Sequence, residues 1–401
     1  MTTSLIVTAH RNNHGPFTLA GNILRALQTE LVTAHLDLMQ RYDIEVLTVA
    51  PEFAPYVTNL RETQTSSVAP QVRTRYYPPA WITRIAHGVT ELIIELARRG
   101  VLHRVTVTEA AQADPTDVEL LSILTRRGAG LVETIVACAP DAPTGAVADP
   151  RDDEATARDY VRFDCMSTDA RVHQAYQRLT PEARMALHDE RGAEIRRQVA
   201  AGEVSLSRWT LPLHAEQGSD PAGAGVAALT DAIELCVLAG FYDAVIGLGE
   251  RLLRFLPDTA TEERWLVTAK VTLALSALGR VEDADAAYDE ACASTTHPSI
   301  HLQSYYGRAM LLTRFVEPSL RDHRRAKALV NTAITIASLL PQTSRRAFNS
   351  TFSENGLALV EMHLGNLADS LRLVEAGIDR LDNADDHDRD AQHRWVLEHN
   401  R

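Results

Sequence analysis

Residues 271–292, VTLALSALGRVEDADAAYDEAC, decide how the second half of this chain folds. The spacing of their apolar residues predicts one helix, a tight turn at the Gly-Arg dipeptide, and a second helix. Four small residues lie where two such helices must approach closely, namely Ala274, Gly279, Ala284 and Ala291. Tyr288 is expected to fill the space beside them. We therefore expect a closely packed helical pair.

Helical pairs of this kind recur from residue 226 onward. The small residues that open the second helix of each pair are Ala244, Ala284, Ala326 and Ser370, at spacings of 40, 42 and 44 residues. The pattern resembles the tetratricopeptide repeat, a helical pair that usually spans about 34 residues. This resemblance implies an all-α solenoid over residues 226–401 whose concave face binds a peptide or protein partner.

Residues 1–140 alternate between short apolar runs and amphipathic runs. The predicted strands are residues 4–9, 44–49, 105–108 and 131–138, and the predicted helices are residues 21–35, 83–98 and 118–127. Strands separated by helices favour a parallel sheet. We therefore expect an α/β domain over residues 1–140.

The middle of the chain connects these two parts. Residues 139–156, APDAPTGAVADPRDDEAT, are rich in Pro, Asp, Gly and Ala and predict a linker. The whole stretch 141–225 is expected to be a linker and helical connector, in which Thr180 and Pro181 begin a helix.

Composition limits the classes of function. The formal charge is −13, from 53 acidic and 40 basic residues, so the chain repels a nucleic-acid backbone and direct nucleic-acid binding is not expected. The 4 cysteines lack the close spacing of a metal knuckle. The N-terminal residues lack the pattern of a signal peptide, and no apolar run reaches the ~20 residues that cross a bilayer. We expect a cytoplasmic protein with no membrane contact.

Residues 105–124, VTVTEAAQADPTDVELLSIL, carry a second resemblance. The sequence from Ala113 to Thr116 and the leucines after it resemble the second nucleotide motif of the STAND-class AAA+ ATPases, which include the large LuxR-type regulators. The resemblance implies that residues 1–140 are the remnant of a P-loop-type sheet. It also implies a regulatory protein, although no DNA-binding helix-turn-helix pattern is present in the sequence.

The departures from that family predict a protein that does not hydrolyse ATP. No GxxxxGK[ST] phosphate-binding loop occurs in the sequence. Thr108 stands where the family has its metal-binding aspartate, and a neutral hydroxyl does not replace a carboxylate on Mg²⁺. Glu109 stands at the position of the catalytic acid and is the one candidate catalytic residue. We expect no cofactor.

Other constellations suggest ligand sites. Arg73, Arg75 and Trp81 belong to an aromatic and basic cluster that suits a phosphate or an aromatic ligand. His10 and His14 have the i, i+4 spacing of metal ligands on a helix, but no third ligand is evident, so no metal is predicted. The acidic run 382–390 fails the calcium-loop pattern, because Ala and Leu fall where Gly and Glu are needed.

The repeat register predicts the partner-binding residues. Lys270, Arg308 and Asn355 fall on the inward side of the second, third and fourth helical pairs. Their side chains suit a carboxylate or a peptide backbone. We therefore expect an adaptor or regulatory protein that binds a partner through its repeats. Two alternatives are an accessory or tailoring enzyme that uses the reshaped cleft around Glu109, His10 and His14, and a regulator that acts through a DNA-binding partner.

Overall fold

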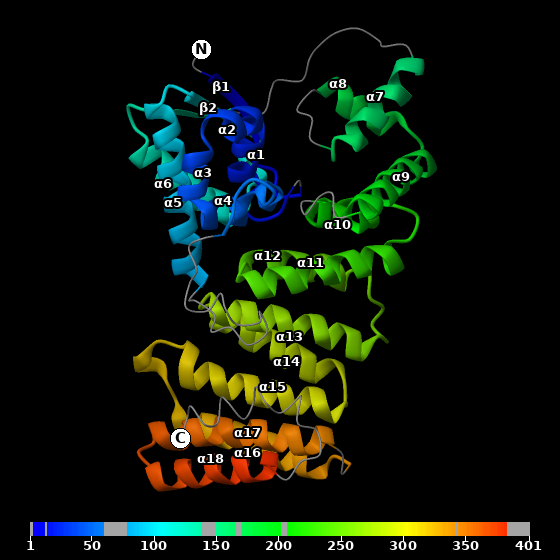
Figure 1. Cartoon of the computed structure of the whole chain (residues 1–401). Helices are drawn as coiled ribbons and strands as arrows, with labels where there is room; N and C mark the ends of the chain where they lie inside the picture. Colours follow the sequence, from blue (N-terminus) through cyan, green and yellow to red (C-terminus); the bar gives the residue numbers. More distant parts are fainter. Residues whose placement is uncertain are drawn as a thin grey trace. The chain divides into compact units, whose positions relative to one another are not determined.

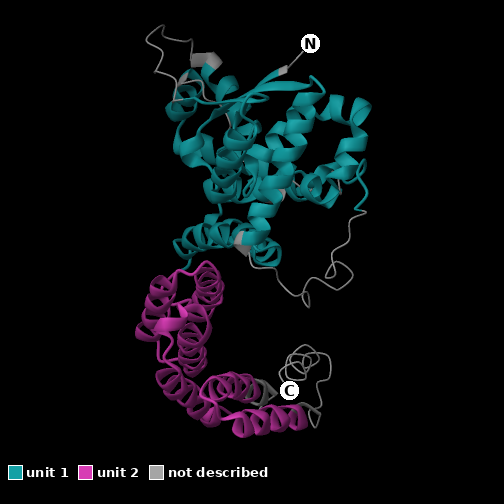
Figure 2. Cartoon of the chain, turned by 90° about the vertical axis from the view of Figure 1, so that its left-hand side faces the viewer, with its two compact units in different colours: residues 1–256 teal, residues 257–401 magenta. Residues whose placement is uncertain are grey.

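The computed structural model describes residues 3–12, 14–59, 78–137, 150–165, 170–201, 207–341 and 344–382 (Figure 1). The chain forms two compact units, Met1–Leu256 and Pro257–Arg401, which we call unit 1 and unit 2 (Figure 2). The described residues are mostly helical, and unit 1 also contains one small sheet.

The sheet consists of three parallel strands in the order β1-β2-β3 within the described residues. The strands are β1 (Thr3–Thr8), β2 (Leu102–Thr108) and β3 (Glu133–Val136). Thr8 pairs with Thr108, and Val107 pairs with Val136. The prediction of a parallel sheet is confirmed, and three of the four predicted strands form it.

Six helices accompany the sheet along the chain. They are α1 (Thr18–Ala26), α2 (Gln28–Ala34), α3 (Leu36–Arg41), α4 (Asp43–Val49), α5 (Pro78–Arg98) and α6 (Pro115–Arg127). The predicted strand at residues 44–49 is wrong, because these residues form α4. The carboxylate of Asp43 accepts a hydrogen bond from the Ile44 backbone N–H at 2.8 Å. Val46 and Val49, three residues apart, bury one helical face.

Six further helices complete unit 1. They are α7 (Pro150–Arg162), α8 (Ala170–Arg178), α9 (Pro181–Ala200), α10 (Ser207–Gln217), α11 (Val226–Ala239) and α12 (Tyr242–Leu253). The Thr180 hydroxyl caps α9 by accepting the Ala183 N–H at 3.2 Å, which confirms the predicted helix start. The predicted linker 139–156 is too long, because α7 begins at Pro150 and its Asp153 pairs with Arg178 of α8 at 2.9 Å.

The units divide between Leu256 and Pro257, whereas the sequence placed the start of the repeats at residue 226. Contacts within unit 1 explain the difference. The rings of Phe241 and Phe17 pack edge to face with centroids 6.0 Å apart. Arg251 of α12 pairs with Glu216 of α10 at 2.9 Å. The first helical pair, α11 and α12, thus packs with the N-terminal unit.

One helical stretch in the described part of the chain, Pro221–Ala239, is long and apolar enough to cross a membrane by composition alone. Its residues Leu229, Ile233 and Cys236 are buried within the protein.

Unit 2 consists of helices that follow one another in close contact (Figure 2). They are α13 (Thr261–Ala277), α14 (Val281–Ser294), α15 (Pro298–Met310), α16 (His323–Leu339), α17 (Ser344–His363) and α18 (Leu367–Asp382). Ala284 and Ala326 are fully buried at the predicted positions in the second helices. Tyr288 packs against Gly307 of the next helix, where any side chain would collide with the tyrosine ring. The predicted pairs of helices are confirmed.

Candidate functional site

The carboxyl ends of β1 and β2 lie side by side, and this edge holds the candidate catalytic residue Glu109. The Glu109 carboxylate accepts a hydrogen bond from the Thr8 hydroxyl at 3.0 Å. Glu109 has a φ of 53°, a left-handed conformation that is uncommon for a residue with a side chain. The loops that follow the two strands are joined by a bridge between His10 and Ala113. Glu109 is therefore held by the first strand of the sheet.

The amino end of α1 is closed by residues of the segment that carries the ATPase resemblance. Asp117 of α6 accepts the Leu19 N–H at 3.0 Å and the Ala20 N–H at 3.4 Å. The Phe17 N–H donates to the Thr116 hydroxyl at 2.7 Å. In a strand–loop–helix unit these first-turn amides are the groups that bind a phosphate. Here a carboxylate of the protein itself occupies them.

Asp117 is fully buried. Burial raises the pKa of its carboxyl well above the ordinary value, and the backbone N–H groups of Leu19 and Ala20 act in the opposite direction. No local pattern predicts this contact, because the helix that provides the carboxylate and the helix that receives it are about 100 residues apart in the sequence.

His10 and His14 lie in the loop between β1 and α1, so their spacing is not that of a helix face. The Nδ1 atom of His10 accepts the Asn12 N–H at 3.2 Å. Burial lowers the pKa of His14 well below its ordinary value, and the charge of Arg25 lowers it further. Across the described residues, no group of three or more His, Cys, Asp or Glu side chains is arranged to hold a metal ion.

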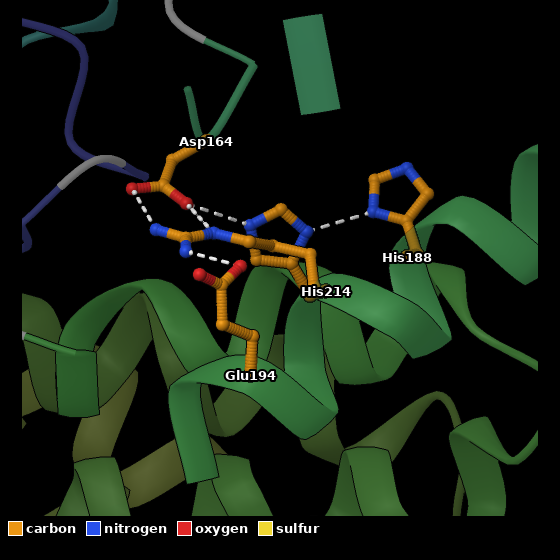
Figure 3. A network of polar contacts seen from close by, with 5 residues as sticks. Asp164, His188, Glu194 and His214 are labelled. Carbon is orange, nitrogen blue, oxygen red and sulfur yellow. Dashed lines mark hydrogen bonds and ion pairs between the residues drawn. The ribbon is translucent and has the colours of Figure 1, made fainter. Parts of the chain in front are cut away.

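A chain of polar side chains joins four segments of unit 1, and Figure 3 shows its part around Asp164, His188 and His214. The Tyr176 hydroxyl lies 2.8 Å from Nε2 of His188, whose Nδ1 lies 2.9 Å from Nδ1 of His214. Nε2 of His214 lies 3.1 Å from the Asp164 carboxylate, which also accepts a hydrogen bond from Arg191 at 2.9 Å. We call these five side chains the histidine network.

The histidine network has one proton assignment that satisfies every contact with neutral rings. His214 donates from Nε2 to Asp164, His188 donates from Nδ1 to His214, and the Tyr176 hydroxyl donates to His188. Burial and the neighbouring His214 lower the pKa of His188 to about 4, which keeps this ring neutral at pH 7. Burial alone raises the Asp164 pKa, but hydrogen bonds from His214 and Arg191 outweigh it and bring the pKa below its ordinary value.

The local backbone brings Asp164 into this network. Asp164 and Cys165 have φ values of 57° and 63°, so a left-handed turn follows α7 and directs the carboxylate toward α9 and α10 (Figure 3). The sequence alone placed His188 and His214 in helical runs but did not bring them together. Every polar group of this network has a partner within the protein, so the arrangement fixes helices relative to one another.

The predicted partner-binding residues lie on the first helices of the pairs in unit 2. Lys270 is half-buried on α13 and Asn355 is half-buried on α17. Arg308 of α15 pairs with Asp285 and Asp289 of α14, both at 2.8 Å. A partner carboxylate would therefore compete with two aspartates at Arg308.

The alternative ligand cluster is described only in part. Trp81 lies at the start of α5, where the Arg84 guanidinium stacks over its ring at 5.6 Å. Arg73 and Arg75 fall outside the described residues, as do residues 383–401 with most of the acidic run.

No protein-family model matches this chain, and no curated protein matches it. The two family resemblances therefore rest on the motifs themselves.

Proposed function

We propose that this chain is a non-hydrolysing adaptor or regulatory protein that binds a peptide or protein segment through tetratricopeptide-like helical pairs. In this proposal the N-terminal domain is a degenerate STAND-like domain. One observation carries the proposal. Large apolar side chains on the first helices of two pairs, α13 and α17, are exposed beside the polar residues Lys270 and Asn355.

Two of the exposed apolar residues occupy equivalent positions. Leu266 of α13 and Phe352 of α17 stand at the same distance in sequence before the small residue that opens the second helix of each pair. Leu266 is 62% exposed and Phe352 is 38% exposed. Leu273 and Met362 extend the two exposed faces by about two to three helical turns. We call these four side chains the apolar stripe.

Recurrence at equivalent positions separates Leu266 and Phe352 from scattered surface leucines. Isolated exposed apolar residues are normal on a protein surface, whereas a set that repeats with the architecture is typical of a binding face. Helix-lined grooves bind an extended or helical segment through such apolar contacts, and neighbouring polar side chains hold its backbone.

The N-terminal domain supports the non-hydrolysing part of the proposal. The α1 amides that would receive a phosphate bind Asp117, and Thr108 offers a hydroxyl where Mg²⁺ needs a carboxylate. The alternative of an enzyme around Glu109, His10 and His14 receives less support, because Glu109 accepts the Thr8 hydroxyl and His10 accepts the Asn12 amide.

Selection from a displayed peptide library on the full chain tests the proposal. We expect the selected peptides to lose at least about tenfold in affinity for the double variant Leu266→Asp/Phe352→Asp, a loss that corresponds to about 1.4 kcal/mol. Leu339→Asp is the matched control, because Leu339 is an equally apolar exposed residue on a second helix, α16. Peptides that bind all three proteins equally would overturn the proposal.

A further inference from the structure

Four basic side chains gather in unit 2 where several helices begin or end. His323 opens α16 and His363 ends α17, and their rings stack in parallel with centroids 4.7 Å apart. Arg314 lies in the short helix η5 (Leu311–Phe315), and Arg321 directly follows the short helix η6 (Pro318–Leu320). We call this group the cation cluster.

The cation cluster lacks compensating carboxylates. In the part of the chain that the structure describes, neither Arg314 nor Arg321 forms an ion pair, although the whole chain carries an excess of acidic residues. Two nearby acids have other contacts. Asp322 accepts the Arg325 N–H at 2.9 Å, and Glu361 pairs with Lys327 at 2.5 Å.

Arg308 provides the contrast within the same unit. Its guanidinium is neutralised by two aspartates of α14, as is usual for a half-buried arginine. Arg314 and Arg321 therefore differ from Arg308 in having no carboxylate partner among the described residues.

The local helix geometry adds to the positive potential. The first turn of α16 contains His323, Arg324 and Arg325 and no acidic residue. The amino end of a helix carries a partial positive charge, so cations there are unfavourable unless an anion is near. Nδ1 of His323 and Nε of Arg321 are buried and have no hydrogen-bond partner among the described residues. Unsatisfied buried donors of this kind are uncommon in proteins.

The charges of the cluster also act on one another. Burial lowers the pKa of His363, and the positive charges of His323, Arg321 and Arg314 lower it further. These groups therefore lie within electrostatic range, and a bound anion would relieve their mutual repulsion.

We propose that the cation cluster is a binding site for a phosphate monoester. The N–H donors of two guanidinium groups and of the two imidazole rings match the three acceptor oxygens of a phosphoryl group, and the two guanidinium charges match its double negative charge. The site shares no residue with the apolar stripe, although Met362 of the stripe directly precedes His363 in α17. The phosphoryl group belongs either to a small metabolite or to a phosphorylated side chain, and both present the same chemistry.

Titration of the full chain with inorganic phosphate, followed by the NMR signals of the His323 and His363 ring protons, tests the site. We expect saturable shifts at constant ionic strength with a Kd of about 1 mM, which corresponds to two charge-assisted contacts of ordinary strength. Phosphate should also raise the pKa of His363, because an anion reverses the effect of the arginines. The double variant Arg314→Gln/Arg321→Gln should lose both responses.

Arg372→Gln is the matched control, because Arg372 is an exposed arginine that pairs with Asp369 at 3.2 Å within α18. It should bind phosphate as the unmodified chain does. The absence of a shift at high phosphate concentration, or equal shifts in the Arg314→Gln/Arg321→Gln variant, would overturn the proposal. Titrations with free phosphoserine and with a phosphoserine peptide then separate the two sources. Tighter binding of the peptide indicates a phosphorylated partner, and equal binding indicates a small metabolite.

Discussion

The amino ends of α1 in unit 1 and α16 in unit 2 differ in the charge of the side chains near them. The first-turn amides of α1 bind the buried carboxylate of Asp117 from a distant helix. The first turn of α16 has its own cap, Asp322, but is surrounded by cations that have no carboxylate partner in the described residues. The amides of α1 are thus already occupied by a carboxylate of the protein, whereas the cations near α16 remain available to an anion.

Removing the Asp117 carboxylate is the strongest test of how the amino end of α1 is stabilised. Asp117→Ala would leave the Leu19 and Ala20 N–H groups buried without an acceptor. Each such group costs about 1–3 kcal/mol, so we expect a loss of about 3 kcal/mol in the free energy of unfolding, measured by urea denaturation. Glu119→Ala on the same helix is the control and should have little effect, because Glu119 is only half-buried. A stability loss no larger than that of the control would show that these amides have another partner.

Overpacking a helical pair tests which residues of unit 2 lie at the contacts between helices. Ala284→Leu inserts a large side chain at a fully buried position between helices and should cost about 1–3 kcal/mol. The loss should extend to the neighbouring pairs, because stability in helical arrays depends on contacts between neighbours. Ala286→Leu provides the matched control on the exposed side of α14. Equal melting temperatures for the two variants would place Ala284 at the surface and disprove the register.

The histidine network should make the stability of unit 1 depend on pH. The pKa of His188 is about 4 in the folded protein and about 6.5 in an unfolded chain. Between these values the unfolded state binds the extra proton, so this residue makes the folded protein less stable as the pH falls. The largest slope for one group is about 1.4 kcal/mol per pH unit.

The variant His188→Gln should remove that contribution. Chemical denaturation at several values between pH 4 and 6.5 should show a shallower pH dependence than in the unmodified chain. Two parallel curves would mean that His188 takes up its proton in the folded state as readily as in the unfolded state.

The smallest expected effect is the response to nucleotide. Isothermal titration of the chain with Mg-ATP should show no binding, because Asp117 occupies the α1 amides and Thr108 cannot replace a carboxylate on the metal. A Kd in the low micromolar range would remove the contrast between the amino ends of α1 and α16, because it would show that nucleotide phosphates reach the α1 amides.

Local patterns in the sequence predicted much of the fold. The small residues Ala284 and Ala326 identified the close contacts of the helical pairs, and Thr180 identified the start of α9. The prediction for residues 44–49 failed because a short run with Val46 and Val49 on one face also allows a short amphipathic helix.

The candidate sites were harder to predict because they depend on contacts across long stretches of chain. Asp117 belongs to a recognisable motif, but its role as an acceptor for α1 follows only from the packing of α6 on α1. His188 and His214 are in contact because α9 and α10 pack together. Asp164 reaches His214 through a left-handed turn that no pattern in the sequence predicts.

The pairing of β1 with β2 has a consequence for the synthesis of the protein. Thr8 pairs with Thr108, so the sheet closes a loop of about 100 residues, with an entropic cost on the order of 4 kcal/mol. At about 5–20 residues per second, β1 leaves the ribosome roughly 5–20 s before β2. The helices of unit 2, by contrast, contact the helices made just before them. The first strand of the chain therefore stays unpaired while the ribosome makes its partner, and during this interval its free edge is open to pairing with other chains.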